Sequence, residues 1–352
     1  MTVNDDSMRA VQLLAPGQPV ADREVPVPAC GPSDVLVRVR AAGICHSDVH
    51  YRAGRSPVDP LPLTLGHEVA GEVVEVGRDV ITHNVGDGVC LHYLVTCGGC
   101  SHCLYGREMF CATGKMLGHF THGGWAEYIA VPARNAVPLP HNVSFEHGAV
   151  MMCSSATSWH ALRRGRLAAG ETVLVIGAGG LGMSAVQLAH EQGAAQVIAV
   201  DRDAARLSLA ARFDSETVNA TDMSAAEVVD AVRAITGGRG VDVALELVGR
   251  ADPVRVALGS LAPRGRVVIV GLNDTPVSVD TYRDLIGRDA ELIGSNDHLL
   301  SELHDLLELA ASGRLQLHDV VTQRVPLEAA AINEVLDALE AGRAPARTVV
   351  IP

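Results

Sequence analysis

Four cysteines lie close together in the segment CGGCSHCLYGREMFC, residues 97–111, with the spacing C-x2-C-x2-C-x7-C. They are Cys97, Cys100, Cys103 and Cys111. Four thiolates without an exchangeable ligand form a closed tetrahedral zinc site of the structural kind. An iron–sulfur cluster is the main alternative, but the bacterial ferredoxin spacing has about three residues before its last cysteine. The segment therefore predicts a structural zinc site, with a cluster or unligated thiols as the alternatives.

A second set of side chains that can bind a metal is spread over residues 43–50 and 65–77. It comprises Cys45, His46, Ser47, Asp48, His50, His67 and Glu68. A catalytic zinc ion takes about three protein ligands and keeps one position open, and two cysteines with one histidine are a documented set. Cys45 and His67 are candidates for such a set, and Cys153 is a candidate for its third member. Each of them also has a simpler interpretation as an ordinary core or surface residue, and spacing alone does not decide between the two.

The motif GAGGLG, residues 177–182, follows an apolar run and precedes a helical stretch, which is the context of a dinucleotide-binding fingerprint. Its first glycine permits a tight turn, its second lets the backbone approach a pyrophosphate, and its third allows the helix to pack on the strand. The N–H groups at the start of the helix would face the phosphates. The predicted contacts are Gly177, Gly179, Gly180, Leu181 and Gly182. A glycine-rich turn without a ligand is the alternative.

An acidic side chain, Asp201, stands nineteen residues after Gly182, at the end of the next predicted strand. Its carboxylate would accept hydrogen bonds from the adenosine ribose and would repel a 2′-phosphate, which favours NAD over NADP. Arg202 follows directly and would attract such a phosphate. We therefore expect NAD as the cofactor, while Arg202 leaves NADP open.

The elements that would position these residues differ between the two halves of the chain. The first half is rich in turn signals, with half-buried strands predicted at 35–40 and 68–77. After Cys153, apolar strands alternate with helical stretches, which is typical of a doubly wound parallel sheet covered on both faces. The predicted strands are 173–177, 196–201, 241–247, 266–271 and 290–295, and the predicted helices are 181–192, 203–213, 299–312 and 327–341, before a closing strand RTVVI.

The composition of the 352 residues excludes several classes of protein. The net charge is −13 and Lys115 is the only lysine, so nucleic acid and anionic membrane surfaces are poor partners. No apolar run is long enough to span a membrane, and the acidic N-terminus lacks the features of a signal peptide. We therefore expect a cytoplasmic protein of roughly two domains.

Together, these motifs resemble those of the zinc-dependent alcohol dehydrogenases of the medium-chain dehydrogenase/reductase superfamily. The resemblance rests on GHE-x2-G-x5-G at 66–77, the cysteine segment, HGGWAEY at 122–128, and GAGGLG with Asp201 downstream. It covers nearly the whole chain, and the motifs occur in the same order. The combination is specific, whereas the glycine motif alone would not be.

The resemblance implies an α/β protein of two domains with two zinc ions. A mostly β, GroES-like catalytic domain would cover residues 1–153 and 297–352, and a Rossmann domain would cover residues 154–296. Cys45, His67 and Cys153 would bind the catalytic zinc ion, and Cys97, Cys100, Cys103 and Cys111 would bind the structural one. Cys30 and Cys90 match no ligand position, so we expect them to be ordinary thiols.

The resemblance also implies roles for the neighbouring side chains. Ser47 would hydrogen-bond the alcohol, and His50 would be the outer end of a proton relay. Asp48 would orient His67, and Glu68 matches a neighbour of the zinc that is not usually a ligand. The implied cofactor contacts outside the glycine motif are His46 and Arg347 at the pyrophosphate, Thr157 beside the nicotinamide, Asp201, Arg202 and Arg206 at the adenosine ribose, and Val248 and Leu272.

The implied activity is that of an NAD-dependent alcohol dehydrogenase or ketone reductase, which acts on a small-molecule alcohol, aldehyde or ketone. Polyol, amino-alcohol and aromatic alcohol dehydrogenases are alternatives, although the thiol of Cys153 favours the alcohol dehydrogenase branch. His92 stands where the family often has a pocket tryptophan, so the substrate preference is expected to differ from that of enzymes with the tryptophan. A non-catalytic nucleotide-binding relative is disfavoured, because the ligands and Ser47 are all present. The chain lacks the long insertion of dimeric animal-type enzymes, so we expect a homotetramer, with a homodimer as the alternative.

Overall fold

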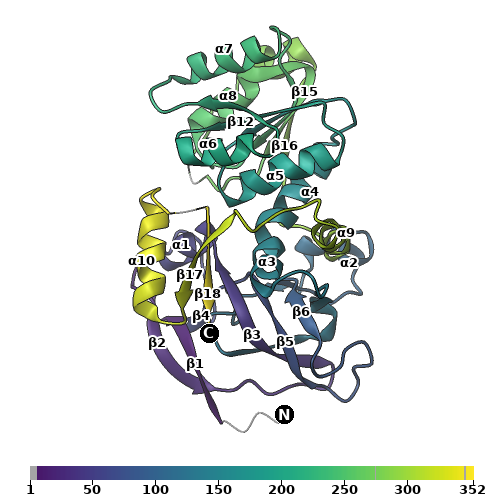
Figure 1. Ribbon diagram of the computed structural model, residues 1–352, viewed down its shortest axis with the longest axis vertical. Helices are drawn as coiled ribbons and strands as arrows, with labels where there is room; N and C mark the ends of the chain where they lie inside the picture. The colour runs from purple at the N-terminus through teal and green to yellow at the C-terminus, as the bar shows by residue number, and fades with distance from the viewer. Residues whose placement is uncertain (1–5, 274, 345) are drawn as a thin grey trace. The chain divides into compact units, whose positions relative to one another are not determined.

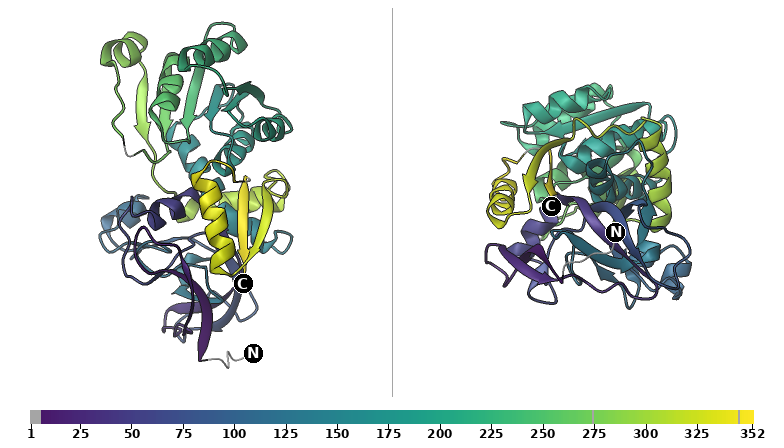
Figure 2. Two further views of the ribbon diagram at one scale, coloured as in Figure 1. Left: turned by 90° about the vertical axis from the view of Figure 1, so that its left-hand side faces the viewer. Right: turned by 60° about the horizontal axis from the view of Figure 1, so that its bottom comes forward.

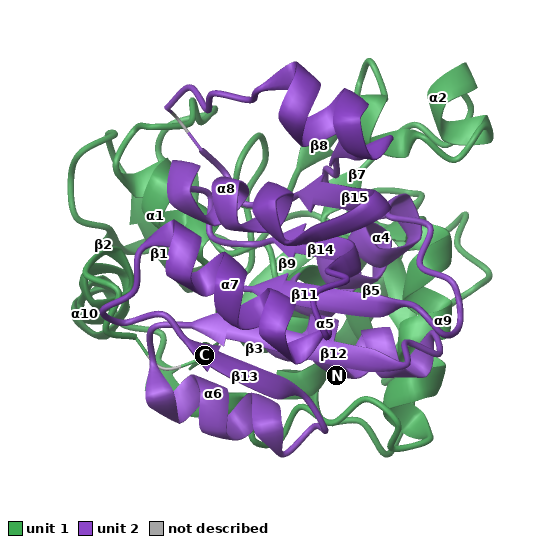
Figure 3. Ribbon diagram, turned by 90° about the horizontal axis from the view of Figure 1, so that it is seen from above, with its two compact units in different colours: residues 1–153, 299–352 green, residues 154–298 purple. Residues whose placement is uncertain are grey.

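The chain folds into two compact units, which Figure 3 shows in different colours. Unit 1 comprises Met1–Cys153 and Leu299–Pro352, and unit 2 comprises Ser154–His298. The structure is a computed structural model, and it describes residues 6–273, 275–344 and 346–352. Segments from both ends of the sequence therefore meet in unit 1.

Unit 1 is built mainly from β-strands. Its larger sheet has the order β10-β6-β5-β3-β18-β17, with β9 also paired to β3, and a smaller sheet has the order β2-β1-β4. The bounds are β1 (Ser7–Leu13), β2 (Ala21–Pro26), β3 (Asp34–Ile44), β4 (Leu63–Thr64), β5 (Val69–Val76), β6 (Gly88–Leu91), β7 (Leu94–Val95), β8 (Lys115–Met116), β9 (Tyr128–Pro132), β10 (Ala136–Pro138), β17 (Val321–Pro326) and β18 (Arg347–Ile351). The C-terminal strand β18 pairs with β3, so the end of the sequence completes the larger sheet.

The central strand β3 is buried over most of its length, although its alternating sequence predicts a strand buried on one face only. Leu36 and Val37 point to opposite faces, and both are fully buried. Strands β5, β9 and β18 flank β3, and α3 packs against it. The predicted alternation holds over Val37–Arg40, where Arg38 is half-buried and Arg40 is exposed, and it is lost at Leu36 and after Arg40, because elements distant in sequence cover the second face there.

Short helices connect the strands of unit 1, and two longer helices come from its C-terminal segment. The bounds are α1 (His46–Arg52), α2 (Ser101–Leu104), α3 (Phe145–Val150), α9 (Leu300–Ala311) and α10 (Ala329–Glu340). Helix α10 packs against α1, where Arg52 pairs with Asp337 at 2.7 Å. Within the ranges that the structure describes, no helix combines the length and the apolar character that crossing a membrane requires.

Unit 2 contains a six-stranded parallel sheet with the order β13-β12-β11-β14-β15-β16. Its strands are β11 (Thr172–Ile176), β12 (Gln196–Asp201), β13 (Glu216–Asn219), β14 (Val241–Glu246), β15 (Leu261–Ile269) and β16 (Glu291–Gly294). Its helices are α4 (Ala156–Arg164), α5 (Gly180–Glu191), α6 (Ala204–Ala211), α7 (Ala225–Ile235) and α8 (Ala251–Ser260). Helix α4 packs on α5 and α7 packs on α8, and the two pairs lie on opposite faces of the sheet (Figure 1 and Figure 2). The predicted doubly wound α/β fold is confirmed.

Strand β13 is the one strand of this sheet that the sequence does not predict. Its residues are mostly polar, and only Val218 is buried. It pairs with β12 at the edge of the sheet. An edge strand of this kind carries little apolar pattern, because one of its sides has no neighbouring strand.

The ionised carboxylate of Asp242, near the start of β14, stabilises the fold of unit 2. Its carboxylate accepts a hydrogen bond from the Thr172 N–H at 2.8 Å and pairs with Arg239 at 2.7 Å. Burial raises the pKa of Asp242, but the bonds from Arg239 and Thr172 outweigh burial and hold the pKa below its ordinary value. A lowered pKa stabilises the fold above the unfolded-state pKa of about 4, and this stabilisation is lost as the pH falls through the folded-state value.

We therefore expect Asp242→Asn to unfold at a lower temperature than the parent protein at pH 7, and this difference to shrink between about pH 5 and pH 3. Thermal unfolding followed by circular dichroism at each pH measures the difference. Asp230→Asn, an exposed position on α7, is the control for loss of one negative charge. A difference that stays constant over this pH range would contradict the role of the Asp242 carboxylate.

Candidate zinc centres and dinucleotide site

Four buried side chains of unit 1 form a candidate metal centre: Cys45, His67, Glu68 and Cys153. One ligand atom from each side chain lies within 4.8 Å of the ligand atoms of the other three. The structure thus brings together the three residues that the sequence predicts as zinc ligands, and it places Glu68 among them.

Three different connections carry these side chains. Cys45 lies between β3 and α1 at the N-cap of the helix, and His67 lies in the connection between β4 and β5. Gly66, which precedes His67, has a φ of 87°, a conformation that favours glycine. Cys153 lies in the π-helical turn Met151–Ser155 between α3 and α4. Such turns are rare, and they occur frequently at functional sites.

The donor set fits a tetrahedral zinc ion. The sulfur atoms of Cys45 and Cys153 are 3.9 Å apart. Two sulfurs bound at about 2.3 Å to one tetrahedral zinc ion would be roughly 3.8 Å apart. Both ring nitrogens of His67 are buried and have no hydrogen-bond partner among the described residues. Because buried polar groups are normally satisfied, a metal ion is the partner that this imidazole lacks.

Asp48, on α1, connects two of these ligands. Its Oδ2 accepts a hydrogen bond from the backbone N–H of Cys45 at 2.8 Å, and its Oδ1 lies 3.6 Å from Nδ1 of His67. Burial lowers the pKa of His67, but the Asp48 carboxylate reverses this effect and holds the pKa well above its ordinary value. A carboxylate beside the second ring nitrogen is the usual means of orienting a metal-binding histidine.

The environment favours ionisation of Cys45 over that of Cys153. A hydrogen bond from Cys153 lowers the pKa of the Cys45 thiol well below its ordinary value, against the effect of burial, and His67 lowers it further. The same bond, together with burial, raises the pKa of Cys153. The thiolate is the form that binds a metal, so Cys45 is prepared for that role.

A buried ion pair lies beside this centre. The guanidinium of Arg347, on β18, pairs with the carboxylate of Glu68, and neither side chain is more than 5% exposed. Burial raises the pKa of Glu68 to about 7, although Arg347 opposes this effect. Glycine is required at position 43, because a Cβ on Gly43 would overlap the Glu68 carboxylate. The resemblance implies that Arg347 contacts a pyrophosphate, and the structure places its guanidinium against Glu68.

The side chains expected to form the proton relay lie on α1 next to Cys45. Ser47 is half-buried, and its Oγ is 3.8 Å from the sulfur of Cys45. His50 is also half-buried, and its ring centroid is 5.4 Å from that of the exposed His46. Polar side chains therefore lead from the metal centre to the exposed side of α1.

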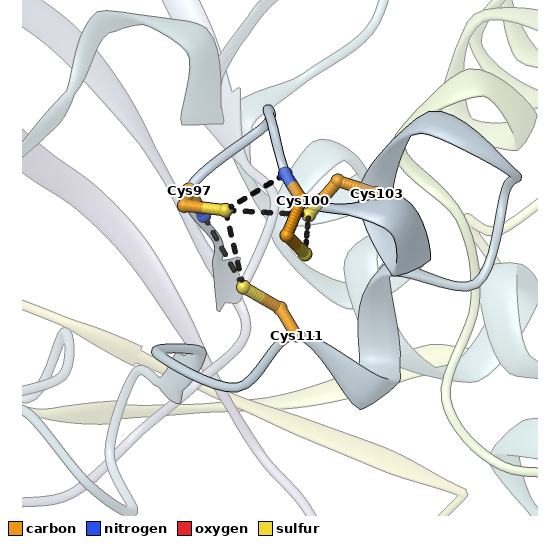
Figure 4. A group of neighbouring side chains, drawn as sticks. All are labelled: Cys97, Cys100, Cys103 and Cys111. Atoms are coloured by element: carbon orange, nitrogen blue, oxygen red, sulfur yellow. Dashed lines mark hydrogen bonds between the residues drawn. The ribbon is translucent and has the colours of Figure 1, made fainter.

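The four cysteines of residues 97–111 form a second candidate metal centre, and Figure 4 shows their side chains converging. The sulfur–sulfur distances are 3.6 Å for Cys97–Cys111, 3.6 Å for Cys100–Cys103 and 3.9 Å for Cys97–Cys103. These distances match the separation expected around one zinc ion. The backbone N–H of Cys97 donates to the sulfur of Cys111 and lowers the pKa of that thiol to about 6. The prediction of two zinc-binding clusters is confirmed.

A buried carboxylate that the sequence does not single out anchors this cysteine lobe to the rest of unit 1. Glu108 accepts a hydrogen bond from the backbone N–H of Leu300, at the start of α9. The same oxygen is 3.4 Å from Nε2 of His92, and the other oxygen is 3.8 Å from Arg134. These partners are distant in sequence, so no local motif reveals Glu108.

The side chain of His92, at the position where the family often has a pocket tryptophan, lies near Glu108, and its neighbour Tyr93 lies near His67. The imidazole of His92 approaches Glu108, whereas the ring of Tyr93 lies edge-on to that of His67, with 5.4 Å between centroids. The ring centroid of Tyr51 is 6.5 Å from that of His67. Two aromatic rings therefore lie near His67, although Phe, Trp and Tyr make up only 3% of the chain. Sequence reasoning missed Tyr51 and Tyr93.

The glycine motif of unit 2 follows β11 and opens α5, as predicted. Gly177 has a φ of 98°, and a Cβ on Gly182 would overlap the carbonyl of Gly177. At Gly179, a Cβ would meet only the guanidinium of Arg206, at 3.9 Å. No side chain caps the first turn of α5, which contains Gly180 and Leu181. This open cradle below an uncapped helix N-terminus fits a pyrophosphate.

Asp201 lies beside the glycine motif and fixes it. Its Oδ2 accepts a hydrogen bond from the N–H of Ala178 at 2.7 Å, and its Oδ1 accepts from the N–H groups of Arg202 and Asp203. Arg206, on α6, pairs with Asp203 at 3.6 Å. The carboxylate thus holds the turn in place, in addition to the ribose contact that its position predicts.

The remaining predicted cofactor contacts of unit 2 lie on loops and on α4. Val248 and Leu272 follow β14 and β15, and they are 43% and 59% exposed. Because the carboxyl ends of parallel strands share one edge, these loops lie along the same edge as Gly177. Thr157 is buried in α4.

Comparison with known proteins agrees with this arrangement. Residues 31–141 match the family model described as "Alcohol dehydrogenase GroES-like domain", and residues 180–312 match the one described as "Zinc-binding dehydrogenase". An NAD-dependent alcohol dehydrogenase of Sulfurisphaera tokodaii is 34% identical to this chain, over 98% of this chain and 100% of its own length. This chain belongs to the zinc-containing medium-chain alcohol dehydrogenase family.

Other members of the family are about as similar. An L-threonine 3-dehydrogenase of Symbiobacterium thermophilum is 35% identical, over 99% of this chain and 98% of its own length. The crystal structure of a zinc-binding dehydrogenase from Sinorhizobium meliloti 1021, bound to NADP, has a TM-score of 0.87 to this structure. The two chains are 31% identical, and the comparison covers 99% of this chain and 100% of that chain. The family makes this chain an NAD(P)-dependent zinc dehydrogenase and confirms the resemblance found in the sequence.

We expect two zinc ions per chain, and we expect Cys100→Ser to lose one of them because it removes a ligand of the cysteine lobe. Loss of a structural zinc ion should lower the melting temperature by roughly 5–15 °C. Plasma mass spectrometry and thermal unfolding measure the two effects. Cys30→Ser is the control, because Cys30 lies outside both clusters and donates to the carbonyl of Asp34. A Cys100→Ser protein with both zinc ions would refute the assignment of the lobe.

Proposed function

We propose that this protein is an NAD-dependent dehydrogenase that interconverts a small or medium-size alcohol and the corresponding aldehyde or ketone. The observation that carries the proposal is the buried cluster of Cys45, His67 and Cys153, with the hydroxyl of Ser47 beside it. Unit 1 would be the catalytic domain and unit 2 the cofactor domain, with boundaries near residues 153 and 297.

The metal centre would prepare the alcohol for oxidation. A bound zinc ion would supply a Lewis acid, and NAD would supply the hydride acceptor. Two thiols and one imidazole leave the fourth position of a tetrahedral site open for the substrate. Asp48 would hold the imidazole of His67 in its orientation, and Arg347 would balance the charge of Glu68.

Ser47 and His50 would move the proton of the alcohol. Ser47 follows Cys45 by two residues, so its hydroxyl would accept the proton next to the metal centre. His50 lies about one turn further along α1 and would pass the proton toward solvent. In the reverse direction, the same two groups would return a proton to the carbonyl oxygen. General acid–base transfer of this kind contributes about 10²–10⁴ in rate.

Unit 2 would hold the cofactor through the glycine motif and the carboxylate of Asp201. The uncapped start of α5 would bind the pyrophosphate, with His46 as a further contact, and Asp201 would accept hydrogen bonds from the adenosine ribose. The carboxylate supports NAD as the preferred cofactor. Arg202 and Arg206 adjoin Asp201, and they make NADP the competing cofactor.

An amino alcohol is the second candidate substrate. The chain is 35% identical to an L-threonine 3-dehydrogenase and 34% identical to an NAD-dependent alcohol dehydrogenase, so the similarity favours both substrate classes about equally. NADH formation with primary, secondary and aromatic alcohols, polyols and L-threonine would separate the candidates. From the resemblance, we also propose a homotetramer, with a homodimer as the alternative, which light scattering would distinguish. We further propose a cytoplasmic location.

We expect Cys45→Ser to abolish alcohol-dependent NAD reduction, because it removes a ligand of the catalytic zinc ion. Ser47→Ala should keep both zinc ions and lose about 10²–10⁴ in kcat, because it removes only the proton acceptor. Initial rates of NADH formation and metal content measure these effects. Cys30→Ser should keep the parent activity. Full activity in Cys45→Ser would refute the proposed centre.

The cofactor preference gives a separate test. We expect Asp201→Asn to lower the ratio of kcat/KM for NAD to that for NADP by about tenfold or more, because it removes a charge that repels the 2′-phosphate. The amide oxygen of Asn can still accept the N–H groups of Arg202 and Asp203, whereas its NH2 group cannot accept the N–H of Ala178. Asp230→Asn carries the same change of charge on the exposed side of α7. An unchanged ratio in Asp201→Asn would remove Asp201 from the recognition of the ribose.

A further inference from the structure

Glu246 is a buried carboxylic acid at the carboxyl end of β14, in the centre of the sheet of unit 2. Its Oε1 accepts two backbone hydrogen bonds, from the N–H groups of Val248 and Gly249, both at 2.8 Å. Its backbone carbonyl accepts two more, from the N–H groups of Val270 and Gly271, both at 3.0 Å. One residue therefore binds the backbone of the loops that follow two neighbouring strands.

The loops held by Glu246 lie so close to each other and to the glycine motif that a Cβ at the contacting glycines would overlap neighbouring atoms. The Val248 side chain lies against Gly177, where a Cβ would come within 2.8 Å of it. A Cβ on Gly249 would overlap the carbonyl of Leu272, and a Cβ on Gly271 would overlap the N–H of Gly249. The position of Val248 therefore depends on the turn at Gly249, which has a φ of 76° and is closed by Glu246.

A carboxylate at this position is costly for folding alone. Glu246 is 0% exposed, and its Oε2 has no hydrogen-bond partner among the described residues. Burial raises the pKa of Glu246, although the N–H groups of Gly249 and Val248 oppose this effect. Leucine would fill the same volume without the desolvation penalty. The stability of the core therefore does not explain a carboxylate here, whereas the position of the Val248 and Gly249 backbone does.

A second acid holds backbone N–H groups on the other side of β11, the strand that precedes the glycine motif. Strand β11 lies between β12 and β14, and each neighbour ends in an acid that accepts backbone N–H groups. Asp201, at the end of β12, holds Ala178 of the glycine motif. Glu246, at the end of β14, holds Val248 against Gly177 from the opposite side. The glycine motif is thus fixed between two loops, each shaped by one carboxylate.

We propose that Glu246 is a positioning residue for the nicotinamide half of the dinucleotide site, acting through the backbone of Val248 and Gly249. This proposal rests on the proposed function, because it assumes that unit 2 binds NAD along this edge of the sheet. Asp201 lies on the adenosine side of β11, so the two carboxylates would serve the two halves of one cofactor. Removal of Glu246 should weaken contacts to the nicotinamide half and leave those to the adenosine half.

The test compares Glu246→Leu, which removes the acceptor and keeps the volume, with Glu246→Gln, whose amide oxygen can still accept both N–H groups. We expect Glu246→Leu to raise the Kd for NADH by about tenfold or more, measured by nucleotide fluorescence, and Glu246→Gln to stay within about threefold of the parent. The KI of AMP as a competitor of NADH should change by less than about threefold in both variants, because AMP carries only the adenosine half.

Asp242→Asn is the matched control, since it changes a carboxylate at the opposite end of the same strand and should lower stability without changing the Kd for NADH. If Glu246→Leu melts earlier but binds NADH like the parent, Glu246 is only structural and the inference is wrong. Equal weakening of NADH and AMP would overturn it as well. Should Glu246→Leu fail to fold, Glu246→Asp, whose shorter side chain misplaces the acceptor, is measured in the same way. A parent protein that binds no NADH refutes the proposed function itself.

Discussion

The meeting of two thiols and one imidazole inside unit 1 is the constraint on which the rest of that unit depends. Cys45, His67 and Cys153 come from three separate connections, and their ligand atoms lie within 4.8 Å of one another. Without a metal, the imidazole of His67 has no hydrogen-bond partner among the described residues, and the Cys45 thiol together with burial raises the pKa of Cys153. Each ligand lies where the backbone is irregular: Cys45 at a helix N-cap, His67 after Gly66 with its positive φ, and Cys153 in a π-helical turn.

Acids that accept backbone N–H groups recur around the two metal centres and the dinucleotide site, and all of them except Asp201 are buried. The pairs are Asp48 with Cys45, Glu108 with Leu300, Asp201 with Ala178 and Glu246 with Val248. A hydrogen bond to a charged acceptor is about twice as strong as one between neutral groups. Each acid ties a loop that carries chemistry, or adjoins it, to a rigid strand or helix. The precision expected of these sites therefore depends on residues that need not touch the substrate.

The sequence predicted those parts of the fold and sites that follow from local spacing. The cysteine segment and the glycine motif are recognisable because a zinc ion and a pyrophosphate each require a fixed succession of residues. The roles of Glu108, Tyr93 and Glu246 were not predictable, since each depends on partners that only the tertiary structure brings near. Strand β13 was missed for a related reason, because pairing with β12, and not an apolar pattern, makes it a strand. Convergence of Cys45, His67 and Cys153 lay between these cases, since the residue types suggested it and the spacing could not establish it.

The pairing of β18 with β3 has a consequence for the order in which the protein is made. Thr348 lies opposite Ile44 in this pairing, so all of unit 2 is synthesised between the two partners. Until β18 emerges from the ribosome, part of the edge of β3 stays open, and Glu68 lacks the guanidinium of Arg347. An open strand edge invites pairing with the wrong chain, and nascent domains generally fold in the order of their synthesis. Unit 2 is therefore the part able to finish first, and the charge balance beside the metal ligands is among the last features of the native state to form.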